Sequence, residues 1–317
     1  MSDILSPGQT IGILGGGQLG RMLAMAAARL GFHVRIFEPG ANPPAGEVAA
    51  KTYTAGYDHK EALEAFAHGV DVVTYEFENV PANALDRIEA LARFRPNRKA
   101  LSVSQDRLSE KTFLNEIGLR TAPFETFDAS APDAPALIAQ AIVSIGTPSI
   151  LKTRRLGYDG KGQARLDALG DAAGALETMA GAEAILEGCV DIEREISVIA
   201  ARGTDGTIAC FEPGENVHKG GILHTTTVPA DISAETRERA FGIAGTILTA
   251  LDYVGVLGVE LFVTPGGLIV NEIAPRVHNS GHWTEAGAVI DQLEQHIRAI
   301  AGWPLLDPVR HSDVVMT

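Results

Sequence analysis

The chain is poor in cysteine, in positive charge and in long apolar runs, and each shortage excludes a class of protein. Only two of its 317 residues are cysteines, Cys189 and Cys210, and neither belongs to a CxxC pair, which argues against a zinc site or a disulfide framework. Lysine and arginine number 26 against 40 aspartates and glutamates, and the net charge of −14 argues against nucleic acid or an anionic membrane as a partner. No apolar run is long enough to span a membrane, and the first residues lack a signal-peptide pattern. We therefore expect a cytoplasmic protein whose ligands are small molecules.

Hydrophobic residues make up 45% of the chain, which is enough for two or more cores. The first core begins with a βαβ pattern: residues 10–14 predict a strand, GGGQLG at 15–20 matches GxGxxG, and a helical period leads to a second strand at 32–39. Glu38 stands where a dinucleotide-binding enzyme carries its ribose-binding acid. Taken alone, this predicts a nicotinamide or flavin site. Any phosphate at a helix N-terminus, or simply a tight turn, favours the same glycines.

A third predicted strand, at 70–81, ends in three polar residues, Glu76, Glu78 and Asn79. Ligands of open α/β sheets bind at the carboxyl ends of the strands. We therefore expect these side chains and residues 16–19 to line one crevice.

A glycine-rich turn joins two β runs within residues 148–166. Asp159-Gly160 alone predicts a plain hairpin. The functional alternative is that the glycines of this turn let backbone N–H groups approach phosphate oxygens, while Lys152 and Lys161 supply positive charge. The GxxxxGK[ST] order of a Walker A loop is absent, so we expect a glycine hairpin that closes over phosphates.

Two further strands are expected within residues 184–203, and they carry Glu187, Glu193 and Glu195. Alternating acids on strands usually mark a solvated face, and the lone His218 that follows is more often structural than a ligand. A last helix is expected at 286–302.

The chain is organised around a hairpin whose two β runs, 258–263 and 268–273, carry Glu260 and Glu272. A four-residue loop would pair Glu260 with Asn271 and send the two glutamates to opposite faces, whereas a five-residue loop or one bulge would pair them on one face. We predict the second register, with a cation facing both carboxylates. The alternative is that both are ordinary exposed strand residues.

Hydrogen-bond donors crowd the exit of this hairpin: Asn271, Arg276, His278 and Asn279. Such a density of donors suits an anion held beside metal-bound phosphate.

Together, the lysine strand with GYDGKGQ, the run EGCV followed by Glu195, and the pair formed by Glu260 and Asn271-Glu272 resemble the ATP-grasp superfamily in order and spacing. The runs GILGGGQLGRMLA, YEFENV and NEIAPRVHNSGHWT are similar, within it, to the 5-(carboxyamino)imidazole ribonucleotide synthase family of the purine pathway. The resemblance covers essentially the whole chain.

The resemblance implies a mixed α/β and α+β fold in three parts. A Rossmann-like parallel-sheet domain would span 1–106. The ATP-grasp region would span 107–301, with a lid at about 123–187 and a larger antiparallel sheet that binds ATP. Residues 302–317 would begin a C-terminal segment, which we expect to be truncated here because the family continues for several dozen residues.

The activity implied is ATP-dependent carboxylation of 5-aminoimidazole ribonucleotide by bicarbonate, through carboxyphosphate, with ADP and phosphate released. The resemblance also implies Mg2+ and a homodimer. The glycine turn would then serve a substrate mononucleotide instead of a dinucleotide.

The resemblance assigns roles residue by residue. Bicarbonate and carboxyphosphate would be held by Arg276, His278 and Asn279, and Mg2+ by Glu260 and Glu272. The imidazole ribonucleotide would be positioned by Gly16, Gln18, Leu19, Glu76 and Tyr158. ATP would be bound by Arg107, Lys152, Gly157, Tyr158, Asp159, Gly160, Lys161, Gly162, Gln163, Glu187, Gly188, Cys189, Val190, Glu195, His218, Asn271 and Glu272.

Three alternatives stay open at this point. The chain could be another ATP-grasp ligase, such as a formate-dependent glycinamide ribonucleotide transformylase or a biotin carboxylase subunit. It could be a nicotinamide-dependent oxidoreductase built on Gly15–Gly20 and Glu38. It could also be a non-catalytic ATP-binding protein.

Overall fold

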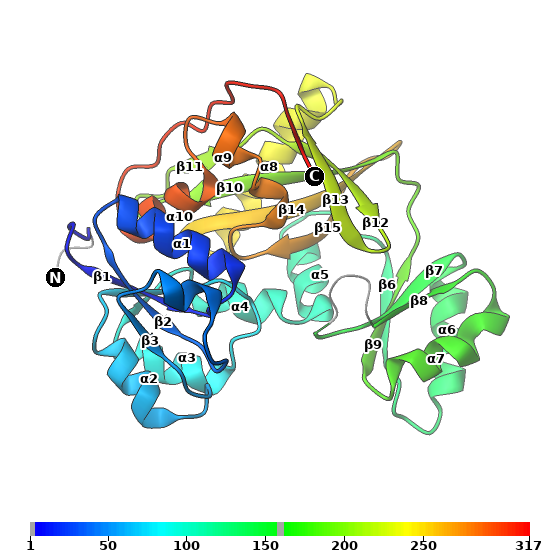
Figure 1. Ribbon diagram of the computed structural model, residues 1–317. Coiled ribbons are helices and arrows are strands. Elements are labelled where there is room, and N and C mark those ends of the chain that lie inside the picture. The colour runs from blue at the N-terminus through cyan, green and yellow to red at the C-terminus, as the bar shows by residue number, and fades with distance from the viewer. Residues whose placement is uncertain (1–3, 157–161) are drawn as a thin grey trace.

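Three β-sheets, each with helices on it, make up the protein (Figure 1). The structure is a computed structural model that describes residues 4–156 and 162–317. Sheets A and B lie together in the larger part of the molecule, and sheet C forms a smaller unit beside them. The predicted combination of a parallel sheet with a larger antiparallel sheet is confirmed, and the smaller sheet C is antiparallel as well.

Sheet A is parallel throughout, with the strand order β3-β2-β1-β4-β5. Its strands are β1 (Thr10–Leu14), β2 (His33–Phe37), β3 (Lys51–Tyr53), β4 (Val72–Tyr75) and β5 (Arg93–Phe94). The connections contain α1 (Gln18–Arg29), η1 (Pro44–Glu47), α2 (Lys60–Ala67) and α3 (Ala82–Glu89). Leu14 pairs with Tyr75 at the carboxyl ends of β1 and β4. The glycine turn after β1 and the acidic segment after β4 therefore meet at one edge of the sheet.

Sheet C is antiparallel, with the order β6-β9-β7-β8. Its elements are β6 (Phe124–Asp128), α6 (Ala134–Ile145), β7 (Ser149–Thr153), β8 (Gln163–Leu166), η2 (Leu169–Asp171), α7 (Ala172–Met179) and β9 (Glu183–Gly188). Lys152 pairs with Gln163, which confirms the predicted hairpin of β7 and β8. Side chains of the sheet and of both helices form a separate core, which includes Leu151, Leu186 and Ile138.

Sheet B is the large antiparallel sheet, with the order β15-β14-β10-β12-β13-β16 and β11 paired to β10. Its strands are β10 (Arg194–Arg202), β11 (Ile208–Cys210), β12 (Gly214–Lys219), β13 (Ile222–Val228), β14 (Gly255–Thr264), β15 (Gly267–Ala274) and β16 (Val314–Met316). Helix α8 (Ala234–Ala250) packs on one face. On the other face, Ile199 and Val256 share a core with Leu23 of α1 and Ile297 of α10 (Gln292–Ile300). This shared core fixes sheet A against sheet B.

Two helices connect sheet A to the rest of the chain: α4 (Arg98–Ser104) and α5 (Arg107–Glu116). Asp106 separates them and caps α5, because its Oδ1 accepts from the backbone N–H groups of Leu108 and Ser109.

The start of the last helix, which was expected at 286–302, was predicted too early in the chain. After η3 (Asn279–Gly281) and the one-turn α9 (Thr284–Gly287), α10 starts only at Gln292. Asp291 sets this start by accepting the N–H of Glu294 at 2.7 Å.

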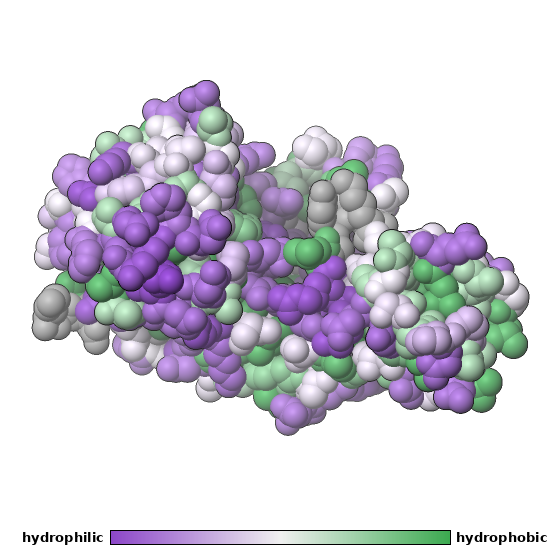
Figure 2. Space-filling view, turned by 90° about the horizontal axis from the view of Figure 1, so that it is seen from below, coloured by the Kyte–Doolittle hydropathy of each residue, from purple (hydrophilic) through white to green (hydrophobic). Residues whose placement is uncertain are grey.

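The surface is mainly hydrophilic where it is seen from below (Figure 2), with hydrophobic residues interspersed on the smaller unit at the right. Among the large hydrophobic side chains that the structure describes, Val143 of α6 is the most exposed, at 83%. Within the described ranges, the structure contains no helix with both the length and the apolar character needed to cross a membrane.

Candidate active site

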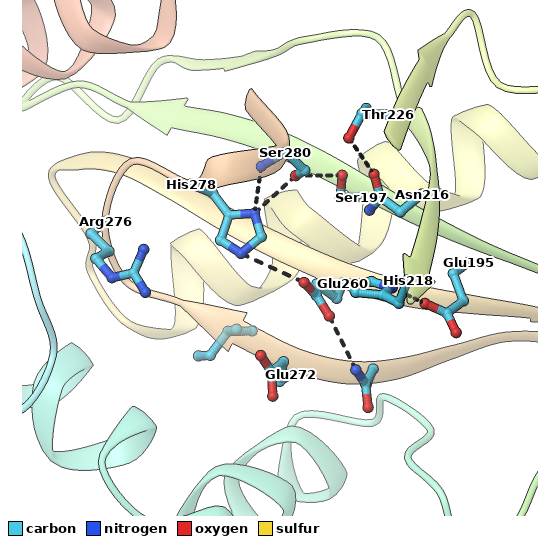
Figure 3. A network of polar contacts seen from close by, with 12 residues as sticks. Glu195, Ser197, Asn216, His218, Thr226, Glu260, Glu272, Arg276, His278 and Ser280 are labelled. Atoms are coloured by element: carbon cyan, nitrogen blue, oxygen red, sulfur yellow. Dashed lines mark hydrogen bonds and ion pairs between the residues drawn. The ribbon is translucent and has the colours of Figure 1, made fainter. Parts of the chain in front are cut away.

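The hairpin of β14 and β15 brings two glutamates to one face (Figure 3). Glu260 lies opposite Glu272, and the register shifts between Glu260 and Leu261, so that Asn271 is an extra residue in β15. This bulged register is the predicted one, and it is confirmed. Asn271 Nδ2 donates to Glu260 Oε2 at 3.1 Å, which orients that carboxylate.

The two carboxylates differ in pKa because their surroundings differ. Burial, and next the charge of Glu272, raise the pKa of Glu260 to about 7. Burial also disfavours the charged form of Glu272, but Arg107 and Lys152 hold its pKa below the usual range. Arg107 Nη1 lies 3.3 Å from Glu272 Oε2. A cation facing both carboxylates would therefore relieve their mutual repulsion.

The donor set fits Mg2+. Among the residues that the structure describes, no three or more His, Cys, Asp or Glu side chains are grouped to hold a metal ion on their own. Mg2+ does not require such a group, because it commonly binds through one or two carboxylates together with water and substrate phosphates. Glu260 and Glu272 are the residues that could hold it.

His278 is held in one tautomer by a chain of serines (Figure 3). The backbone N–H of Ser280 points at His278 Nδ1 at 3.3 Å, and since an N–H can only donate, Nδ1 is an acceptor. Ser197 Oγ donates to Ser280 Oγ at 2.7 Å, which leaves the Ser280 hydroxyl proton for Nδ1 at 2.8 Å. The ring proton therefore lies on Nε2, which faces Glu260 Oε1 at 3.5 Å. Burial, and next Arg276, lower the pKa of His278 to about 4, so the ring is neutral.

Backbone contacts fix the position of His278 as well. Its N–H donates to Gln292 Oε1 at 2.9 Å, and its carbonyl accepts from Gln292 Nε2 at 2.7 Å. Gly258 of β14 leaves room for the ring, because a Cβ there would lie 2.9 Å from the His278 Cβ. The imidazole is therefore a fixed donor.

Arg276 connects the hairpin exit to sheet A. Its Nε donates to Glu78 Oε2 at 2.7 Å, beyond the end of β4. These side chains, with Arg107, Glu272 and His278, line a hollow of about 100 Å3. Asn279, predicted for the same place, is exposed at the start of η3.

The end of β9 is linked to the site through Lys152, whose charge acts on Glu272. Glu187 is buried there, 5% exposed, and its Oε2 accepts from Lys152 Nζ at 2.9 Å. The expectation that such alternating acids face solvent is therefore wrong for Glu187, although Glu193 is exposed. Gly188 follows Glu187 at the end of β9, where its N–H donates to Pro123 O at 2.9 Å.

The next two predicted residues, Cys189 and Val190, directly follow β9 and are partly buried. Farther along, Glu195 Oε2 lies 2.6 Å from His218 Nδ1, so these two predicted residues are partners. The hydrogen bond that His218 makes to the Glu195 carboxylate raises the pKa of His218, which favours its charged form.

The structure describes both strands of the glycine hairpin, up to Leu156 and again from Gly162. Gly157, Tyr158, Asp159, Gly160 and Lys161, all predicted site residues, lie outside the described residues. Gly162 is partly buried and adopts φ 66°, and its carbonyl accepts from Thr153 N at 2.8 Å. Gln163 is exposed in β8. The structure thus places both ends of this hairpin on sheet C.

The glycine turn after β1 is filled by the protein's own carboxylates. Glu76 accepts from the N–H groups of Gly17 and Gly20, and Glu38 Oε2 accepts from Gly16 N at 3.0 Å. Burial raises the pKa of Glu76 despite these two bonds. A carboxylate thus occupies the helix N-terminus that a dinucleotide needs for its pyrophosphate. The oxidoreductase alternative therefore loses its binding site.

A hollow of about 500 Å3 opens at this turn, lined by Gly16, Glu38, Tyr57 and Glu76 among others. Leu19 is partly buried and Gln18 exposed in the first turn of α1. Two residues of the segment after β4 line different hollows: Glu76 lines this one, and Glu78 lines the smaller one at Arg276. The single crevice expected at the carboxyl ends of β1 and β4 is thus divided in two: Gly16 and Glu76 line the larger hollow, whereas Glu78 and Asn79 line the smaller one beside the glutamate hairpin.

Sequence reasoning missed several residues of the site. Ser197 and Ser280 are fully or nearly fully buried, yet a serine carries no sequence signal of its role. Glu110 and Lys111 of α5 are also buried, at 3% and 1% exposure. Adjacent charged residues in a helix normally predict a solvent-facing side, and no local signal could have placed them inside.

Comparisons with known proteins agree with this geometry. The family of ATP-grasp domains matches residues 112–293, and the family of ribonucleotide synthetase preATP-grasp domains matches residues 8–105. The chain is 56% identical to the N5-carboxyaminoimidazole ribonucleotide synthase of Brucella melitensis, over 98% of this chain and 86% of that protein. It is 41% identical to the enzyme of the same name from Pseudomonas aeruginosa, over 93% of this chain and 80% of that protein.

Solved structures are similar as well. The ADP complex of an N5-carboxyaminoimidazole ribonucleotide synthetase superimposes with a TM-score of 0.94 at 40% identity, covering 99% of this chain and 82% of that one. An enzyme from Aspergillus clavatus in complex with ADP and 5-aminoimidazole ribonucleotide has a TM-score of 0.88 at 30% identity, covering 95% of this chain and 78% of that one.

Proposed function

The chain belongs to the N5-carboxyaminoimidazole ribonucleotide synthase family of ATP-grasp ligases, and we propose that its cleft performs that family's reaction with the residues described above. ATP drives the carboxylation of 5-aminoimidazole ribonucleotide by bicarbonate. The products are N5-carboxyaminoimidazole ribonucleotide, ADP and phosphate. The observation that carries the site assignment is the pairing of Glu260 with Glu272 on one face of the hairpin.

Bicarbonate needs activation because hydroxide is a poor leaving group. A bicarbonate oxygen attacks the γ-phosphorus of ATP, the bond to the β-γ bridging oxygen breaks, and ADP leaves. The resulting carboxyphosphate, or CO2 released from it, is attacked by the exocyclic amine, which loses a proton as phosphate departs. Carboxyphosphate hydrolyses readily, which gives a reason for a site that excludes water.

The residues at the exit of the β14–β15 hairpin suit the binding of bicarbonate and carboxyphosphate, the two anions of this reaction. Arg276 supplies a positive charge, and His278 presents a neutral Nε2–H donor beside Glu260. We assign these two residues, with Asn279, to bicarbonate and carboxyphosphate. Glu260 and Glu272 would hold Mg2+, which when bound neutralises charge on the ATP phosphates.

The nucleotide is assigned to the space between the hairpin and sheet C. Arg107 and Lys152 offer positive charge near Glu272. The end of β9, from Glu187 to Val190, would line the adenine, and Glu195 would accept from the ribose hydroxyls with His218 beside it. The residues from Gly157 to Lys161, with Gly162, Gln163, Asn271 and Glu272, complete this assignment.

5-Aminoimidazole ribonucleotide is assigned to the hollow at the glycine turn. Gly16, Gln18, Leu19, Glu76 and Tyr158 would position it there. The segment after β4 separates this hollow from the one that Arg276 lines, so the amine could face the activated carboxyl group. From the family alone, we also propose a cytoplasmic homodimer with a lid at about 123–187. Light scattering on the purified protein would test the dimer.

Phosphate release tests the reaction. We expect fast release only when ATP, Mg2+, bicarbonate and 5-aminoimidazole ribonucleotide are all present. Formate with glycinamide ribonucleotide should give only background release. Equal release with the second pair would contradict the proposed substrate. Binding of ATP without any release would favour a non-catalytic ATP-binding protein.

Ser280→Ala tests the assignment of His278. The variant removes the hydroxyl donor to Nδ1 and leaves a weak backbone contact at 3.3 Å. We expect kcat to fall about tenfold or more, because small displacements of a catalytic donor are costly. The KM for ATP should stay near that of the wild type. Ser312→Ala, on the exposed C-terminal segment, is the matched control. Unchanged kcat in Ser280→Ala would contradict the role of the serine chain.

A further inference from the structure

Three charged side chains from three elements meet beneath the expected nucleotide site. Lys111 comes from α5, Lys152 from β7 and Glu187 from β9. Glu187 Oε2 lies 2.9 Å from Lys152 Nζ, and Glu187 Oε1 lies 3.4 Å from Lys111 Nζ. The side chain of Lys111 is 2% exposed and that of Glu187 is 6% exposed, whereas Lys152 reaches outward at 14%. Two cations therefore share one anion, and the more exposed cation is the one assigned to ATP.

The backbone explains why this arrangement forms. Glu187 pairs with Ile150 in sheet C, so Lys152, two residues farther along β7, projects from the same face. Helix α5 approaches that face with Lys111. One turn earlier the helix carries Arg107, which contacts Glu272. Helix α5 thus supplies Arg107 to the hairpin of β14 and β15 and Lys111 to sheet C.

Lys111 alters the electrostatic environment of Lys152, because both lysines contact the carboxylate of Glu187. Burial raises the pKa of Glu187, but Lys152 and Lys111 together lower it below the usual range, so the carboxylate is charged. Without Lys111, the buried carboxylate would keep Lys152 as its hydrogen-bonded partner, with the charge of Arg107 also acting on it, and the Lys152 ammonium group would be drawn into a tighter pair. With Lys111 present, the three groups keep a net charge of one positive unit, which can act on an anionic ligand.

We propose that Lys111 is a positioning residue for nucleotide binding: it shares the charge of Glu187 and so leaves the ammonium group of Lys152 available to ATP. The proposal rests on the proposed function, in which Lys152 and Glu187 contact the nucleotide. Lys111 itself does not touch ATP. Its effect passes through Glu187, and it should vanish when Glu187 carries no charge.

A double-mutant cycle tests this. Lys111→Met keeps the length and apolar stem of the side chain but removes its charge. We expect the Kd for ADP, and the KM for ATP, to rise about tenfold, while the KM for 5-aminoimidazole ribonucleotide stays unchanged. In a Glu187→Gln background, Lys111→Met should change the Kd for ADP less than twofold. Lys111→Arg should bind ADP like the wild type, and Lys60→Met, on an exposed helix position, is the matched control.

Two results would overturn the proposal. One is an equal rise in Kd in both backgrounds, which would make Lys111 a direct ligand of ATP or a residue that only supports the fold. The other is a Kd for ADP in Lys111→Met equal to that of the wild type. If Lys111→Met does not fold, Lys111→Gln, which keeps a hydrogen-bond donor without the charge, takes its place in the same cycle. A wild-type protein that binds no ADP would contradict the proposed function itself, whatever the variants do.

Discussion

Glu272→Gln is expected to lower Mg2+-dependent phosphate release by more than about a hundredfold while the fold stays intact. The amide keeps the size of the side chain and one acceptor oxygen, but it loses the charge that a bound cation and Arg107 both require. Metal ions stabilise the charge of a phosphoryl transition state by several kcal/mol, and each 1.4 kcal/mol is about tenfold in rate. Circular dichroism should be that of the wild type.

Glu235→Gln provides the matched control, because it makes the same change on α8, where the side chain is 75% exposed. Its rate of phosphate release should equal that of the wild type. If Glu272→Gln releases phosphate at the wild-type rate, the metal assignment of the hairpin is wrong.

His296→Ala is expected to lower the free energy of unfolding by about 3–5 kcal/mol at neutral pH. The ring is completely buried between sheets A and B, where Nδ1 accepts from Val256 N at 3.1 Å and Nε2 meets Thr74 Oγ1 at 2.8 Å. Alanine leaves a cavity and two buried polar groups without these partners, and both effects destabilise the fold. Urea denaturation at pH 7.5 measures the change. His33→Ala, at an exposed position of β2, should lose little.

The same histidine predicts how stability depends on pH. Burial lowers the pKa of His296 to about 3, below the 6.5 of an ordinary histidine. Its neutral form therefore stabilises the fold fully above pH 6.5, and this contribution is lost as the pH falls toward 3. His296→Phe carries no such proton, so its stability should fall less than that of the wild type between pH 7 and pH 4. Parallel curves for the two proteins would contradict a buried neutral His296.

Local patterns predicted much of the fold because the interactions that form it are close in sequence. The βαβ pattern around Gly15–Gly20 predicted a parallel sheet, since a parallel pair needs a crossover connection. The pairing of Glu260 with Glu272, by a five-residue loop or one bulge, was predicted for a chemical reason: a buried carboxylate without a partner is costly, so a cation was expected to face both. The boundary of the last helix was misplaced because its cap, Asp291, resembles any other loop aspartate.

The partners of the glycine turn could not be predicted in the same way. The turn matched a dinucleotide site, and although Glu76 was expected near it, nothing in the sequence revealed that the Glu76 carboxylate would accept hydrogen bonds from the backbone amides of the turn. Lys111 was hidden for a related reason. The sequence of its helix predicts an amphipathic helix with an exposed lysine, and Lys111 is buried only because Glu187 of β9 packs against it.

By itself, the sequence determined the three sheets, the pairing of Glu260 with Glu272 and the family of ligases to which the chain belongs, because each follows from short-range pattern, turn geometry or motif order. The tertiary structure alone decided which charges share a partner. Glu187 between its two lysines, Glu76 at the helix N-terminus and His278 on its serines each join groups far apart in the chain. The strength of a charge depends on burial and on neighbours within a few ångströms, and these exist only once the sheets have packed.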